Sequence, residues 1–335
     1  MIYYIYMIMI IIMIITSTRK ISNGNEKYSI EQNLPIRGVL SILVIMCHIF
    51  PQAYLLGNIA VSIFFCFSGY GLMWGYMNKK SPFKNYFKNK IINTILPFWI
   101  INIIYYIYYC FNDKSYTFGE FVLSFFNASI LTIGWYIIVL SILYIVFYCI
   151  FKKSDIKNKV KVLAVCVATI FLIFILYIVG CKSWWYCSLL AFPIGILLKY
   201  NDRKITILCT NKHKWLTIII IVSFLLVYGV TKYYNIEDGL LFLLIKVYMS
   251  IVACYFYIRY SDKYIIKNKI LNFIGKYSLI IYLIHPLIIK IINKCAVINI
   301  LKFPIVLIIS IIISYIYNQT AKYIKNINNS GGIKL

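Results

Sequence analysis

Charged residues are scarce in this chain. Only 13% of its 335 residues are Asp, Glu, Lys or Arg, whereas 62% are hydrophobic. Soluble domains average about 25% charged and about 45–50% apolar residues, so this composition excludes a soluble fold. Acidic residues are the rarest of the charged ones, with 9 Asp and Glu against 34 Lys and Arg, and the net charge is +25.

Groups of metal ligands are also missing. The ten cysteines are scattered, no CxxC pair occurs, and no cluster combines cysteines with the three histidines. Because a bound zinc ion needs several such ligands at short spacings, we expect no metal. The basic residues stand in short groups between apolar blocks rather than on one basic face, so we expect no nucleic-acid partner either.

What the chain does contain is a series of long apolar blocks. Each has about 16 to 22 residues, the length that crosses about 30 Å of hydrocarbon as a helix. The blocks cover approximately residues 34–56, 58–76, 91–111, 133–151, 160–180, 184–199, 215–232, 239–259, 276–295 and 303–321. The sequence therefore predicts an all-α integral membrane protein with about ten transmembrane helices in the lipid bilayer.

The basic residues indicate an orientation for these helices. If the segment before the first block is cytoplasmic, most of the 34 Lys and Arg residues fall on the cytoplasmic side. The exceptions are Lys114, Lys182, Lys232, Lys246, Lys290, Lys294 and Lys302. By the positive-inside rule, we expect a multi-pass protein of the cell membrane with both ends of the ten-span unit in the cytoplasm.

Three regions are expected along the chain. Residues 28–321 form one transmembrane domain, and residues 322–335 form a polar cytoplasmic tail. Residues 1–18 are an accessory apolar segment, which is either an eleventh, thin span, an interfacial helix or a stretch upstream of the true start. The longest outer gap contains an apolar stretch at 118–131, which fits a surface or re-entrant helix better than a full span.

Two ionisable residues share one face of the first predicted span. Pro35 is expected to open this helix. Arg37 and His48 are eleven residues apart, which at about 100° and 1.5 Å per residue places them on one face about 16 Å apart. Ionisable groups inside a membrane are costly and are candidates for function. The alternative is that Arg37 anchors the topology while His48 hydrogen-bonds a neighbouring helix.

Two other spans contain polar residues at a comparable depth. In the second span, Ser68 is followed by Gly69 and Gly71, which by themselves favour close helix packing over chemistry. In the ninth span, Tyr282 and His285 are three residues apart and share a face. Pro286 lacks an N–H and so frees the carbonyl of Tyr282. A kinked packing helix with a satisfied histidine is the alternative interpretation.

The chain resembles the membrane-bound acyltransferase 3 family in four motifs. In order, these are an Arg followed by His after ten residues at 37–48, Phe-Phe-x-x-Ser-Gly-Tyr at 64–70, Gly-Trp-Tyr at 134–136 and Ser-Leu-Ile-Ile-Tyr-Leu-Ile-His-Pro at 278–286. The likeness covers about residues 28 to 321. The chain departs from the family at Asn93, where an arginine is common, and it lacks the aspartate often found ahead of the second span.

The resemblance implies transfer of an acyl group, usually acetyl from cytoplasmic acetyl-CoA, to a hydroxyl of a cell-surface or lipid-linked saccharide acceptor. It also implies that Arg37 and His48 are the essential pair. His48 would act as the general base, and Arg37 would hold coenzyme A, assisted by Lys88 and Lys90. The residues available to stabilise the oxyanion are Ser68, Tyr282 and His285.

Two other classes of protein stay open at the level of the sequence. A transporter or flippase of a lipid-linked saccharide would use the histidines as proton relays, but no Asp or Glu stands in the middle of a predicted span. A non-catalytic membrane scaffold would have little reason to place Arg37 and His48 on one face. The oligomeric state, including a homo-oligomer, is also left open.

Overall fold

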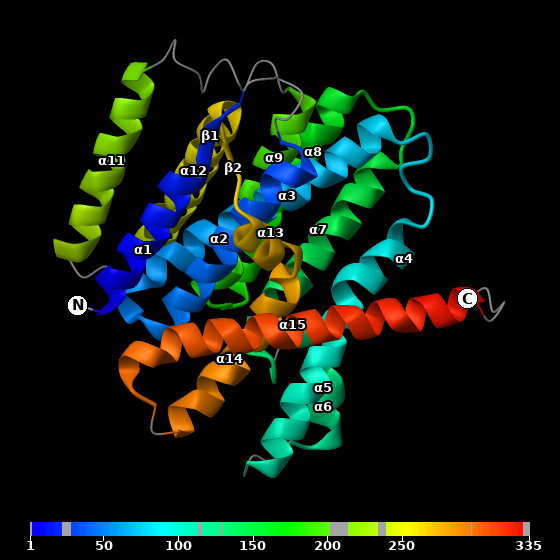
Figure 1. The fold of residues 1–335 in the computed structure, drawn as a ribbon. Coiled ribbons are helices and arrows are strands. Elements are labelled where there is room, and N and C mark those ends of the chain that lie inside the picture. Colours follow the sequence, from blue (N-terminus) through cyan, green and yellow to red (C-terminus); the bar gives the residue numbers. More distant parts are fainter. Residues whose placement is uncertain are drawn as a thin grey trace. The chain divides into compact units, whose positions relative to one another are not determined.

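The protein is described from a computed structural model, which covers residues 2–21, 28–112, 116–127, 129–201, 214–233, 239–295 and 297–330. Most of these residues are helical, as predicted (Figure 1). The chain divides into two compact units. Unit 1 comprises Met1–Gly57, Ile100–Lys114 and Ile265–Leu335, and unit 2 comprises Asn58–Trp99 and Ser115–Tyr264.

Unit 1 is centred on the first long helix, α2 (Ile30–Ile49). This helix packs against three others, and α14 also packs against α15. The three are α13 (Lys269–Lys276), α14 (Ser278–Lys294) and α15 (Asn299–Ser330). The unit also holds α1 (Ile2–Ser17) and most of α5 (Leu96–Phe111). Helices from the two ends of the sequence therefore form one core.

Two glycines let the backbones of α2 and α13 touch. A Cβ on Gly38 would collide with the carbonyl oxygen of Leu271, and a Cβ on Gly275 would collide with that of Leu34. Small residues at such crossings permit the close packing on which membrane helices depend. The crossing fixes α2 against α13 within the first turns of α2.

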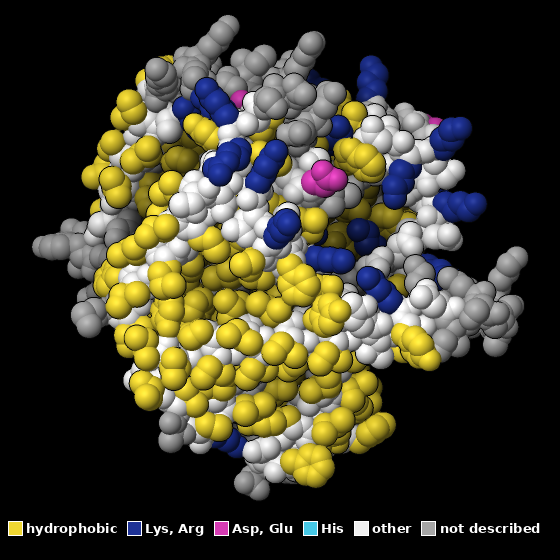
Figure 2. All heavy atoms as spheres, in the orientation of Figure 1, with side chains coloured by type: hydrophobic (Ala, Val, Ile, Leu, Met, Phe, Trp, Pro, Cys, Tyr) yellow, Lys and Arg dark blue, Asp and Glu magenta, His cyan; other side chains and the backbone are white. Residues whose placement is uncertain are grey.

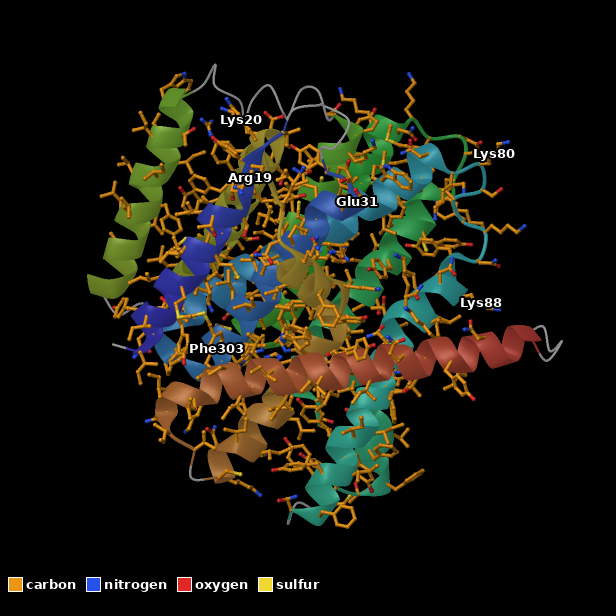
Figure 3. All side chains as sticks on the ribbon, viewed as in Figure 1. Arg19, Lys20, Glu31, Lys80, Lys88 and Phe303 are labelled. Atoms are coloured by element: carbon orange, nitrogen blue, oxygen red, sulfur yellow. The ribbon has the colours of Figure 1, made fainter. Side chains whose placement is uncertain are left out.

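The N-terminal helix α1 is packed into unit 1. Its start contacts α15, where the Tyr6 hydroxyl donates to the carbonyl of Ile300 and its ring lies 4.7 Å from that of Phe303 between centroids. At its end, Asn268 Nδ2 donates to Ser17 Oγ at 2.9 Å. The strand β1 (Thr18–Lys20) follows Ser17 in the chain, and the strand β2 (Tyr264–Ile266) precedes Asn268. They form a two-stranded sheet that the sequence did not predict. Figure 3 labels Arg19, Lys20 and Phe303 near the two ends of α1.

Unit 2 contains the remaining helices. They are α3 (Tyr54–Asn78), which starts in unit 1, α4 (Tyr86–Lys90), α6 (Phe118–Asn127), α7 (Trp135–Phe151), α8 (Asn158–Ile178), α9 (Ala191–Tyr200), α11 (Lys214–Tyr233) and α12 (Gly239–Lys263). A π-helical turn, Ile91–Ile95, joins α4 to α5. It forms where Pro97 has no N–H to donate to the carbonyl of Asn93. The N–H of Leu96 bonds to the carbonyl of Ile91, five residues earlier instead of the usual four.

The predicted count of about ten spans is not confirmed. Among the described residues, seven helical segments are long and apolar enough to cross a bilayer, and a pair bent by 79°, Lys269–Lys276 with Ser278–Lys294, makes an eighth if it is one span. The seven are Glu31–Ile49, Pro51–Asn78, Tyr86–Phe111, Thr132–Phe151, Asn158–Ile178, Gly239–Lys263 and Asn299–Ile324.

The differences from the predicted spans have local causes. The region predicted as a span at 184–199 contains a 3-10 turn and then α9, whose ten residues reach only about 15 Å. The first helix was predicted at 34–56, but α2 ends at Ile49 because Phe50 is extended and precedes Pro51. Its start is also earlier. Ser29 caps it by accepting from Gln32 N–H, so Pro35 lies inside the helix instead of opening it.

Hydrophobic side chains cover the outer faces of these helices. On α1 the exposed residues include Ile5, Ile8, Ile12 and Ile15, spaced three or four apart along one face, and α15 exposes Ile308, Ile312 and Ile316 in the same way. Figure 2 shows such side chains as a broad apolar surface. Exposed apolar faces of this extent suit contact with lipid.

Candidate functional site

Two of the predicted site residues meet in unit 1. The rings of His48 and His285 lie 5.0 Å apart between centroids. His48 is in the last turn of α2, rather than in the middle of a longer helix as predicted, because α2 ends one residue later. His48 is exposed and His285 is completely buried. The pair therefore combines one imidazole that a substrate can reach with one that is enclosed by protein.

Hydrogen bonds identify which nitrogen of His285 carries a proton in the neutral ring. Nδ1 lies 3.1 Å from the carbonyl oxygen of Ile281, and the ring also has a backbone hydrogen bond with Tyr282. A carbonyl can only accept, so Nδ1 is the N–H donor and Nε2 carries the lone pair. Within the described part of the chain, Nε2 is buried without a hydrogen-bond partner. The His285 ring, 5.0 Å from that of His48 between centroids, thus contains an unpaired proton acceptor.

Pro286 makes this arrangement possible. A residue at this position would normally donate its N–H to the carbonyl of Tyr282, four residues earlier, and proline cannot do so. The freed carbonyl is one that the His285 ring contacts. The ring of Tyr282 lies 6.1 Å from that of His285 between centroids, and Tyr282 is almost fully buried. The predicted association of Tyr282, His285 and the freed carbonyl is therefore present in α14.

A residue that the sequence did not single out completes this cluster. The Tyr105 hydroxyl, from α5, accepts from Leu287 N–H at 2.9 Å and donates to the Leu283 carbonyl at 3.2 Å. Tyr105 is 3% exposed. The apolar block that contains it has four tyrosines, Tyr105, Tyr106, Tyr108 and Tyr109. Composition gave no signal to choose among them.

Arg37 lies on the same helix as His48. The two residues belong to the unbroken helix Ile30–Ile49, so the predicted spacing of about 16 Å along one face holds. Arg37 is half-buried. It precedes Gly38, where α2 meets α13. Arg37 is therefore close to the packed start of the helix, and His48 is at its other end.

Ser68 belongs to unit 2, where its surroundings favour packing. Its hydroxyl donates to the Phe64 carbonyl of its own helix at 3.0 Å. A Cβ on Gly69 would collide with the carbonyl of Phe192, so Gly69 permits the close approach of α9 to α3. Gly71 was expected to do the same, but among the described residues nothing lies within 4 Å of the point that its Cβ would occupy. The motif thus has one packing glycine and a serine that bonds within its helix.

The two lysines predicted to assist donor binding have different surroundings in unit 2. Lys90 is half-buried, and its Nζ lies 4.0 Å from the ring centroid of Tyr144, a cation–π contact. Lys88 is exposed at the end of α4, as are Lys80 and Lys84 in the turns before that helix. Figure 3 labels Lys80 and Lys88 in this region. Lys88 is the more accessible of the two predicted cations.

Unit 2 also contains a polar network that the sequence did not reveal. Asn58 Oδ1 accepts from the hydroxyl of Ser188 at 2.9 Å and from the thiol of Cys187 at 3.1 Å. Ser62 donates to the Ser188 hydroxyl at 3.1 Å, and Lys246 Nζ donates to Ser183 at 3.0 Å. Such bonds satisfy polar groups inside apolar helices. The signal was the presence of Asn58 and Lys246 within apolar blocks.

The fold and the histidine pair define a membrane protein whose helices hold a candidate acid–base site. Comparison with known families identifies the class of this protein. A family model described as an acyltransferase domain matches residues 36–319. The chain belongs to the acyltransferase 3 family and is a membrane acyltransferase. Comparisons with curated proteins and with solved structures found no match.

Proposed function

We propose that the protein is an O-acetyltransferase that moves an acetyl group from acetyl-CoA to a hydroxyl of a cell-surface or lipid-linked sugar. Family membership supports acyl transfer. The observation that supports a hydroxyl acceptor is the pairing of an exposed His48 with a buried His285, whose ring centroids lie 5.0 Å apart. A hydroxyl nucleophile needs a base that works near neutral pH, and histidine is the side chain suited to that task.

The proposed reaction assigns His48 as the base. Its imidazole takes the proton of the acceptor hydroxyl as that oxygen attacks the thioester carbonyl. The C–S bond then breaks, the acetyl group stays on the sugar oxygen, and the proton returns from His48 to the leaving thiolate of coenzyme A. The Nε2 lone pair of His285 would accept the other ring N–H of His48 and so orient the base, as acceptors do for catalytic histidines.

The remaining groups have supporting roles in this proposal. Arg37 would hold the phosphates of acetyl-CoA on the cytoplasmic side. The distance of about 16 Å from Arg37 to His48 along α2 leaves room for the extended pantetheine arm. The hydroxyl of Tyr282 would donate to the developing oxyanion. Lys88 and Ser68, which belong to unit 2, stay candidates for donor binding and for the oxyanion. Lys90, packed on Tyr144, would contribute less to donor binding.

The transporter or flippase alternative has less support. The matched family is one of acyltransferases, and a carrier would need no exposed base paired with a second, buried imidazole. A flippase would also change the location of a sugar without changing its acyl content. The two functions therefore differ in a measurable product.

The decisive experiment compares host glycans by mass spectrometry with the wild-type protein, without it and with His48→Gln. We expect an acetyl mass on one glycan that is present only with the wild-type protein. Purified protein with radiolabelled acetyl-CoA should label the same glycan. If wild-type and His48→Gln cells have identical glycan acetylation and purified protein transfers no label, the acetyltransferase proposal is wrong.

A further inference from the structure

The strongest additional feature is the bridge that the Tyr105 hydroxyl makes between Leu283 and Leu287 of α14. In a regular helix the N–H of Leu287 bonds the carbonyl of Leu283. Here the N–H donates to the Tyr105 hydroxyl at 2.9 Å, and the same hydroxyl donates to the Leu283 carbonyl at 3.2 Å. A hydroxyl that bonds both of these backbone groups competes with the helical bond between them and can shift the local helix geometry.

The bridge encloses the segment that presents His285. Leu283 and Leu287 lie two residues before and two residues after the histidine. Between them Pro286 lacks an N–H, so the helical hydrogen bond from this position to the Tyr282 carbonyl cannot form. The His285 ring uses that freed carbonyl together with the one of Ile281. Tyr105 therefore bonds the ends of the turn that contains His285.

We propose that Tyr105 is a positioning residue: its hydroxyl fixes the geometry of the turn at Leu283–Leu287, so that His285 stays in the Nδ1–H form with its ring next to that of His48. This role rests on the proposed function of the histidine pair and adds a residue from a separate helix, α5. A buried hydroxyl that both donates and accepts costs little, whereas its removal leaves two backbone groups to find new partners.

A purely structural role would give a different outcome from a positioning role. Without the hydroxyl, Leu287 N–H and the Leu283 carbonyl can bond each other directly, which restores a stable helix. The helix would thus survive Tyr105→Phe, but the hydrogen bonding of the turn beneath His285 would change. The ring would then lose its preferred contacts, and its proton would distribute between Nδ1 and Nε2.

The test uses full-length protein in detergent, labelled with ¹⁵N-histidine, in the wild-type form and as Tyr105→Phe. Tyr106→Phe is the matched control because its hydroxyl neighbours Cys110 of the same helix. The chain has only three histidines, so His48→Gln and His285→Gln assign the signals. Initial rates with acetyl-CoA and the acceptor glycan, and thermal melting, are measured on the same samples.

We expect the His285 nitrogens of the wild-type protein and of Tyr106→Phe to have the shifts of an Nδ1–H tautomer. In Tyr105→Phe they should move toward averaged values. The kcat should fall about tenfold or more, with both KM values within about twofold and melting little changed, because a misplaced base slows the chemical step more than binding. If Tyr105→Phe does not fold, Pro286→Ala tests the same turn by restoring the N–H that competes for the Tyr282 carbonyl, and the same movement of shifts is expected.

Unchanged His285 shifts in Tyr105→Phe, or in Pro286→Ala where that variant replaces it, would overturn the proposal. So would a lower melting temperature with an unchanged kcat, because that result describes a structural role alone. The NMR arm does not depend on catalysis. If the wild-type protein transfers no acetyl group, the proposed function fails while the nitrogen shifts still decide whether Tyr105 positions His285.

Discussion

His48 and His285 come from helices at opposite ends of the chain, and their rings lie 5.0 Å apart with one exposed and the other buried. His48 is the more accessible ring, and a backbone carbonyl assigns the proton of His285. In the proposed reaction the two rings act together, which has consequences that two independent residues would not have.

The two histidines should be non-additive in catalysis. General base catalysis contributes about 10²–10⁴-fold, so His48→Gln should lower kcat by about that factor and His285→Gln by a smaller one. The double variant should be no slower than His48→Gln, because His285 acts through His48. Steady-state rates of the three variants test this. Multiplied losses in the double variant would show that the residues act independently.

The crossing of α2 and α13 should tolerate no side chain at Gly38. Because an added Cβ would meet the backbone of Leu271, we expect Gly38→Ala to cost about 1–3 kcal/mol, measured as a lower melting temperature in detergent. Gly75→Ala is the control, since nothing lies within 4 Å of its Cβ position among the described residues. Equal melting of the two variants would contradict the close crossing.

Arg37 should be needed as a guanidinium and not only as a charge. A lysine cannot reproduce the planar fork that binds phosphate, and a charge-assisted hydrogen bond contributes about 1.5–3 kcal/mol. We therefore expect Arg37→Lys to raise the KM for acetyl-CoA about tenfold with little change in the KM for the acceptor. Normal donor affinity in equilibrium binding of coenzyme A would remove Arg37 from the donor site.

Lys88 and Lys90 should respond differently to the same substitution. Lys88 is exposed, whereas Lys90 lies over the Tyr144 ring. We expect Lys88→Met to raise the KM for acetyl-CoA a few-fold at unchanged melting temperature, because a phosphate contact near the surface is screened by salt. Lys90→Met should mainly change the melting temperature. The reverse pattern would exchange their roles.

The short helix α6 should loosen in acid. Thr117 and Glu120 form a capping box, with Thr117 N–H donating to Glu120 Oε2 at 2.8 Å and Glu120 N–H donating to Thr117 Oγ1 at 3.2 Å. The bonds that Thr117 donates to the carboxylate, from its N–H and from its hydroxyl at 3.0 Å, lower the pKa of Glu120. A lowered folded-state pKa stabilises α6 above the unfolded value of about 4.3, and this contribution is lost as the pH falls through the folded pKa.

Hydrogen exchange of the α6 amides, corrected for intrinsic rates, measures this effect between about pH 6 and pH 3, on either side of the unfolded pKa. Protection should decrease below about pH 4.3 in the wild-type protein. Glu120→Gln should have lower protection at all of these pH values and no step. A step that persists in Glu120→Gln would assign the pH dependence to another group.

The class of the protein and several features within single helices could be predicted from the sequence. Apolar blocks of membrane length, the spacing of Arg37 and His48, and the carbonyl freed by Pro286 all depend on near neighbours along the chain, and they are read without a partner helix. The family motifs belong to the same local information, and the matched domain at 36–319 confirms the family that they indicated.

Which residues contact each other depends on the tertiary structure. The end of α2 at Ile49 depends on a local break in the helix. The position of His48 beside His285 depends on how α2 packs on α14. The choice of Tyr105 among four tyrosines depends on a contact with a residue 178 positions away in the chain. Periodicity and composition indicate which face of a helix is polar. The partner of that face follows from packing between distant segments, and such packing is a property of the whole fold.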